Sequence, residues 1–125
     1  MKFELNFMNK STDETITMYR PTGPEELELV KASGFLRWPP RLPEQSIFYP
    51  VTNEEYAKEI TVKWNIPAKG LGYVTQFKVK RSFVDQYEIH QVGGTKYTEW
   101  WIPAEKLKEL NDNIVGKIEV IGEYK

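Results

Sequence analysis

The sequence predicts one compact α+β domain with a mixed, mostly antiparallel β-core and about three helices. Two helix patterns occur in the first half of the chain and most strand patterns in the second, without a regular β-α-β repeat. The length of 125 residues fits one domain, since domains typically have ~100–150 residues. Hydrophobic residues make up 40% of the chain and charged residues 28%, which is ordinary for a globular protein.

Composition also narrows the functional class. A net charge of −1 disfavours a nucleic-acid partner, because such proteins neutralise phosphates with a basic surface. The absence of cysteine excludes disulfides, thiol catalysis and iron–sulfur clusters, and a single histidine, His90, cannot form a multi-histidine metal site, so we expect no metal. No apolar run approaches the ~20 residues of a membrane helix, and the first residues lack the apolar core of a signal peptide. We therefore expect a cytoplasmic protein that does not bind membranes.

The first residues predict two strands. Phe3, Leu5 and Phe7 alternate with polar residues, which is the period of a half-buried strand. Residues 15–19 are β-branched or aromatic except for one methionine, and they predict a second strand that stops at Arg20 and the proline after it.

A helix is predicted next, up to about residue 32. Thr22 and Glu25 have the spacing of a capping box, and Ser33-Gly34 is a typical helix end. Within this helix, Leu27 and Val30 are expected to face the core.

Residues 37–43 contain three prolines, which forbid a helix or a central strand and predict a stiff, extended segment. Trp38 and Leu42 are expected to anchor it. A short strand should follow over residues 47–49.

The second helix is expected to begin at another capping box, Thr52 with Glu55. Tyr56, Ile60 and Trp64 recur at intervals of four, so they are predicted to be buried together on one helical face.

The second half of the chain is rich in strand patterns. Residues 71–80 alternate most clearly, and residues 87–92 and 97–102 predict a hairpin with its turn at Gly93-Gly94. A last strand is expected over residues 118–121. Between them, Pro103 suits the first turn of a helix that should end at Gly116, with Leu107, Leu110 and Ile114 on its buried face.

Two groups of residues are candidates for a binding site. Arg37, Trp38 and Arg41 place two guanidiniums around an indole on the proline-rich frame, where they could hold a phosphate and stack on a base. The alternative is a surface connection whose tryptophan covers the core. Glu99 lies in a predicted strand with Tyr97 and Trp101 on its own face, and a carboxylate among aromatic residues is unusual there. It is either recessed, as catalytic carboxylates often are, or an edge-strand residue that reaches water.

Several stretches resemble a family of small bacterial proteins described as "ADP-ribosylation/crystallin J1" proteins. The similarity covers roughly residues 17–121. The stretches that carry it are Tyr19-Arg20-Pro21, Ser33-Gly34-Phe35, Trp38-Pro39-Pro40-Arg41, Ile47-Phe48-Tyr49-Pro50-Val51, Glu55-Tyr56-Ala57, Gly72-Tyr73-Val74-Thr75, Val92-Gly93-Gly94, Trp101-Ile102-Pro103-Ala104-Glu105 and Asn113-Ile114-Val115-Gly116.

The layout is also similar to the ADP-ribosyltransferase fold, whose split β-core carries an Arg or His, an aromatic or Ser, and a Glu on successive strands. That resemblance implies that Arg20, with Arg37 or Arg41, holds the diphosphate of NAD, that Tyr49 stacks on nicotinamide, and that Glu99 is catalytic. It implies NAD as substrate and a protein among the possible acceptors of ADP-ribose. The alternative is a non-catalytic module on the same fold that recognises a protein or a nucleotide-like small molecule.

Overall fold

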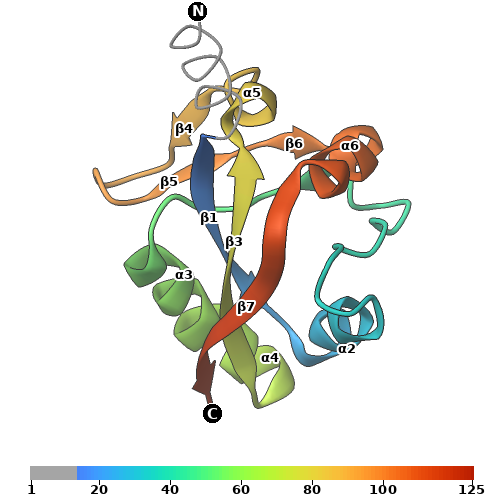
Figure 1. The fold of residues 1–125 in the computed structure, drawn as a ribbon. Helices are drawn as coiled ribbons and strands as arrows, with labels where there is room; N and C mark the ends of the chain where they lie inside the picture. Colours follow the sequence, from blue (N-terminus) through green and yellow to red (C-terminus); the bar gives the residue numbers. More distant parts are fainter. Residues whose placement is uncertain (1–13) are drawn as a thin grey trace, which may run out of the picture.

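A three-stranded antiparallel sheet forms the centre of the protein, in a computed structural model that describes residues 14–125 (Figure 1). Its strand order is β1 (Thr15–Thr22), β3 (Gly72–Lys80) and β7 (Ile114–Tyr124). The middle strand thus pairs with the first and last strands of the described chain. The strand predicted around Phe3, Leu5 and Phe7 lies outside the described residues.

Strand β3 confirms the alternation predicted for residues 71–80 from Thr75 onward, whereas Val74 and Thr75 are both buried. Phe77 and Val79 are buried, whereas Lys78 and Lys80 are exposed. Strand β7 is longer than the predicted segment 118–121 and pairs along nearly all of β3.

Strand β1 also exceeds its predicted length, because it continues through Arg20 and Pro21. The N–H of Tyr19 donates to Val51 O at 2.9 Å, on the side away from β3. Pro21 lies two residues further along, so its missing N–H falls on the same outer side and removes no bond to β3. Arg20 is therefore inside a strand and not at its end.

Two short antiparallel pairs extend the β-structure. Strand β2 (Ile47–Phe48) pairs with β6 (Ile102–Pro103), and β4 (Ile89–Gln91) pairs with β5 (Thr98–Trp100). The β4–β5 pair confirms the predicted hairpin. Its turn is longer than Gly93-Gly94, since Tyr97 N donates back to Gly94 O at 3.0 Å.

Helix α2 (Pro24–Ala32) confirms the first predicted helix, with Leu27 and Val30 buried. The predicted capping box is wrong, because the N-cap is Gly23 and no side chain caps the helix. Thr22 is still part of β1, and its hydroxyl donates to Arg20 O at 3.1 Å instead.

Helix α3 (Glu54–Ile60) begins one residue later than predicted, because Asn53 is the N-cap and accepts from Tyr56 N at 2.8 Å. A wide π-type turn (Thr61–Asn65) follows it, and then α4 (Ile66–Lys69). The wide turn inserts about one residue, which rotates later positions by ~100°. Trp64 is consequently 69% exposed, so the prediction that it is buried with Tyr56 and Ile60 is wrong.

The C-terminal helix is shorter than predicted. A 3₁₀ turn (Ala104–Lys106) leads into α6 (Leu107–Asp112), which buries Leu107 and Leu110 as expected. Ile114 begins β7 and is not helical, because this β-branched residue pairs with Val79 of β3. A further short helix, α5 (Arg81–Val84), follows β3 directly.

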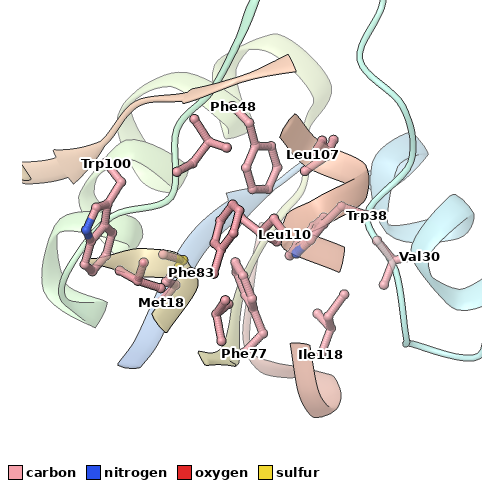
Figure 2. Close-up of a cluster of buried hydrophobic side chains, with 13 residues drawn as sticks. Met18, Val30, Trp38, Phe48, Phe77, Phe83, Trp100, Leu107, Leu110 and Ile118 are labelled. Carbon is pink, nitrogen blue, oxygen red and sulfur yellow. The ribbon is translucent and has the colours of Figure 1, made fainter. Parts of the chain in front are cut away.

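The main core lies between the central sheet and the elements around it, and Figure 2 shows Trp38 among Phe48, Phe77 and Leu110. The centroids of the Trp38 and Phe77 rings lie 5.1 Å apart, and the two rings meet edge-on. Trp38 anchors the proline-rich segment as predicted, and the segment has neither helix nor regular strand. Leu42 does not anchor it, because its side chain is 56% exposed.

Asn111 of α6 fixes Trp38 in this position. It accepts from Trp38 N at 2.8 Å and donates to Trp38 O at 3.0 Å, so both polar groups of the buried backbone are satisfied. The described part of the protein is thus α+β with antiparallel sheets. None of its helices has the length and apolar character needed to cross a membrane.

Candidate functional site

One hollow of about 350 Å³ is lined by Arg20, Tyr49 and Glu99, the three residues that the resemblance implies for NAD binding and catalysis. Val51 explains how they meet. It pairs with Tyr19 of β1 on one side and with Glu99 of β5 on the other, so it connects the central sheet to the hairpin. Arg20 is the next residue along β1, and Tyr49 precedes Val51 by two residues.

Arg20 is held from two directions. Its Nε and Nη2 donate to Glu26 Oε1 and Oε2 at 3.2 and 2.9 Å, a two-point ion pair with the first turn of α2. Its Cζ lies 4.4 Å from the centroid of the Phe48 ring, which adds a cation–π contact. Only 11% of the side chain is exposed, so this guanidinium is a fixed positive charge.

Arg41 brings a second guanidinium to the same hollow. Its Nη2 donates to Ile47 O at 3.0 Å, while its Nη1 lies 4.0 Å from Glu26 Oε2. Its buried Nε has no partner among residues 14–125. Burial, and then the positive charge of Arg20, lower the pKa of Arg41. Arg41 is therefore short of negative charge and of a hydrogen-bond acceptor.

Glu99 is positioned by two aromatic donors. The Tyr56 hydroxyl donates to Oε1 at 2.8 Å, and Trp101 Nε1 donates to Oε2 at 2.9 Å. Burial, followed by the hydrogen bond to Glu99, raises the pKa of Tyr56 to about 12, so its hydroxyl remains a donor at neutral pH. Each carboxylate oxygen has a further lone pair that a ligand hydroxyl could use.

Tyr49 is the aromatic residue among those lining the hollow. Tyr49 is 43% exposed and meets Trp101 edge-on, with ring centroids 6.4 Å apart. His90, to which the sequence assigned no role, stacks on Trp101 at 3.7 Å. Trp101 and His90 support Tyr49 from outside the lining, so Tyr49 is the ring that a ligand in the hollow could contact.

Comparisons with protein-family models, curated proteins and solved structures find no match for this chain. The chemistry of the site therefore follows from its geometry alone. Two guanidiniums, an exposed aromatic ring and a fixed carboxylate can bind an anion that carries a ring and a hydroxyl group. Within residues 14–125, no three His, Cys, Asp or Glu side chains are grouped to hold a metal.

Arg37 and Trp38 do not line this hollow. Arg37 Nη2 donates to Asp112 Oδ1 at 3.1 Å, and both Arg37 and Trp38 line a different pocket, beside α6. Trp38 is only 2% exposed, which agrees with the alternative that its ring covers the core. Of the proline-rich candidates, only Arg41 therefore joins Arg20, Tyr49 and Glu99.

The sequence did not single out Glu26, Tyr56 or Trp101 as site residues. The acidic first turn of α2 is a usual helix feature, so nothing marked Glu26 as the partner of two arginines. Trp101 was noted as a neighbour on the face of Glu99, and this spacing of two along a strand was a usable indication.

Proposed function

We propose that this protein binds a nucleotide-like anion, NAD or ADP-ribose, at the hollow lined by Arg20, Arg41, Tyr49 and Glu99. The observation that carries the proposal is the convergence of two guanidiniums and an exposed aromatic ring on one site. Guanidiniums bind phosphate oxygens at two points, and aromatic rings stack on bases or nicotinamide. The similarity of the predicted layout to that of ADP-ribosyltransferases favours the same ligand class.

We assign the diphosphate to Arg41, because Arg41 has fewer partners than Arg20. Arg20 donates from Nε and Nη2 to both carboxylate oxygens of Glu26, whereas Arg41 has one backbone acceptor and an unpartnered Nε. A phosphate oxygen would supply the missing acceptor and offset the repulsion between the two guanidiniums.

The shape favours a ligand with two halves. A second hollow of about 390 Å³ also contains Arg20 and Arg41, on the side of α2. A ligand whose diphosphate contacts the guanidiniums could place one ribose ring near Tyr49 and the other half in this second hollow. Both volumes are in the range of small-molecule sites, ~300–1,000 Å³.

Transfer of ADP-ribose is a second candidate function, and Glu99 is the observation that favours it. Its carboxylate lines the hollow and is fixed by Tyr56 and Trp101. Loss of nicotinamide from NAD leaves positive charge on the ribose, and a preorganised carboxylate stabilises such charge in the transition state. A non-catalytic binding module needs the guanidiniums but not this carboxylate.

Calorimetric titration of the protein with NAD and ADP-ribose tests the binding proposal. We expect both ligands to bind at millimolar concentration or below, and Arg41→Gln to weaken binding about tenfold, because one charged hydrogen bond is lost. Arg81→Gln is the matched control, since Arg81 forms an exposed pair with Asp85 on α5. The proposal would be overturned if neither ligand binds, or if Arg41→Gln binds them with the same affinity as the wild type.

A further inference from the structure

A separate pocket of about 540 Å³ lies between the proline-rich segment and α6. Arg37, Arg41 and Lys108 contribute positive charge to its lining, and Glu105 contributes one negative charge. Tyr49 and Glu99 line the hollow described above and not this pocket. The pocket and that hollow have only Arg41 in common.

Each of the three cations shares its carboxylate with another cation. Arg37 and Lys108 both contact Asp112, at 3.1 and 3.3 Å from its two oxygens. Arg41 competes with Arg20 for Glu26. The side of the pocket formed by these cations therefore has less negative than positive charge, which favours an anionic ligand.

Two residues of the pocket lining carry unpartnered donors. Among residues 14–125, the buried side-chain nitrogens without a hydrogen-bond partner are Trp38 Nε1 and Arg41 Nε, and both residues line it. A buried donor without an acceptor is unfavourable, so an oxygen-rich group near these residues would be stabilised.

Apart from Asn111, the uncharged residues of the lining are apolar or aromatic. Pro40 and Ala104 face the pocket together with Leu107, whose side chain belongs to the main core. A purely inorganic anion would leave this surface without a partner, whereas a hydrocarbon body would cover it.

We propose that this pocket is a second binding site, for a small organic anion in which one carboxylate or phosphate group is joined to an apolar body. The oxyanion contacts Arg37 and Arg41, and the apolar body packs on Pro40 and Leu107. The site shares Arg41 with the NAD site, but its ligand needs neither Tyr49 nor Glu99.

Titrations followed by NMR test the proposal with three probes: benzoate, phenyl phosphate and the neutral analogue benzamide. We expect benzoate or phenyl phosphate to bind at least tenfold more tightly than benzamide, and the difference between the two anions identifies the oxyanion. Arg37→Gln should weaken the anion about tenfold. No binding by either anion, or equal binding of benzamide, would overturn the proposal.

One further variant distinguishes an anion-binding site from a cluster of charges that only stabilises the fold, because the two predict opposite changes in anion affinity. Asp112→Asn removes the carboxylate shared by Arg37 and Lys108, so it should tighten anion binding several-fold. Asp112 is half exposed, so the variant should remain folded. Weaker anion binding in this variant would contradict the proposal. Tyr49→Ala should leave benzoate binding unchanged and Arg37→Gln should leave NAD binding unchanged, so failure at one site can be told from failure at the other.

Discussion

Arg20 and Arg41 approach the same oxygen of one carboxylate. Arg20 Nη2 lies 2.9 Å and Arg41 Nη1 4.0 Å from Glu26 Oε2. The ring of Phe48 lies close to both guanidiniums, with its centroid 4.4 Å from Arg20 Cζ and 5.7 Å from Arg41 Cζ. Two positive charges and one negative charge are thus held with little access to water, and the group has a net attraction for an anion.

Glu26→Gln should change stability and ligand affinity in opposite directions. Removing the shared carboxylate leaves two guanidiniums uncompensated, so the free energy of unfolding should fall by about 1.5–3 kcal/mol. The same excess charge should tighten binding of ADP-ribose. Urea denaturation and calorimetry measure the two effects.

Glu28→Gln is the matched control for this change, because Glu28 is exposed on the same helix. Its effect on stability should stay within about 0.5 kcal/mol. Weaker binding of ADP-ribose by Glu26→Gln would show that Glu26 itself contacts the ligand, contrary to the charge argument.

The spacing of apolar residues along the sequence predicted those helices and strands whose buried side chains recur at regular intervals. Strand β3 and the buried face of α2 follow from alternation and from the spacing of Leu27 and Val30. The start of α3 was predicted one residue early, because Thr52 and Asn53 are both suitable N-caps. The wide turn after α3 has no sequence signature of this kind, so the position of Trp64 could not be predicted.

The site required information that no local pattern contains. Glu99 could be selected from its place in a strand, whereas Arg20 and Tyr49 were selected through the resemblance to the ADP-ribosyltransferase layout, and the hollow brings all three together. Their meeting depends on the pairing of Val51 with two strands that are far apart in the sequence. The stiffness of the proline-rich segment was predictable. The inward position of Trp38, however, depends on the two hydrogen bonds between its backbone and the side chain of Asn111.

Two tryptophans should respond very differently to truncation. Trp64→Ala should change the free energy of unfolding by no more than about 0.5 kcal/mol, because the side chain is 69% exposed. Trp100→Ala should lower it by about 3–5 kcal/mol, because Trp100 is 4% exposed and its removal leaves a cavity in the core. Chemical denaturation of both variants measures the difference. A large loss in Trp64→Ala would mean that the face predicted from the sequence is buried after all.

Gly72 is required where β3 passes the wide turn. A Cβ at this position would lie 2.7 Å from Thr61 Cγ2 and 3.1 Å from Asn65 Cβ. Gly72→Ala should therefore lower the free energy of unfolding by about 1–3 kcal/mol through overpacking. Thermal or urea denaturation measures the loss.

Two variants check that the Gly72 effect is steric. Thr61→Ser removes Cγ2 but keeps the hydroxyl that donates to Ala57 O, so it should restore part of the stability lost in Gly72→Ala. Gly94→Ala should be tolerated, because its Cβ would meet Tyr97 only at 3.5 Å. Failure of Thr61→Ser to restore any stability would exclude the clash with Thr61 as the cause.

Tyr56 should make stability depend on pH in the alkaline range. Its pKa of about 12 in the folded protein lies above the value of ~10 for an unfolded chain. The unfolded state therefore loses this proton first, so the contribution of Tyr56 is complete below about pH 10 and disappears as pH rises toward 12. Urea denaturation at several pH values should show a smaller alkaline loss in Tyr56→Phe than in the wild type. Parallel curves would contradict the raised pKa.

Glu99→Gln separates an ADP-ribosyltransferase from a binding module. The change keeps the size of the side chain and removes its charge, so NAD affinity should remain almost unchanged. Release of nicotinamide from NAD should fall by about 10²–10³-fold, the usual effect of losing one well-placed charged group in the transition state. Arg41→Gln should instead act mainly on binding, since it contacts the diphosphate in the ground and transition states alike. Glu59→Gln is the control, because Glu59 also accepts from a tyrosine, Tyr97, but does not line the hollow. If the wild type binds NAD and releases no nicotinamide, the site is a binding module and Glu99 only shapes it.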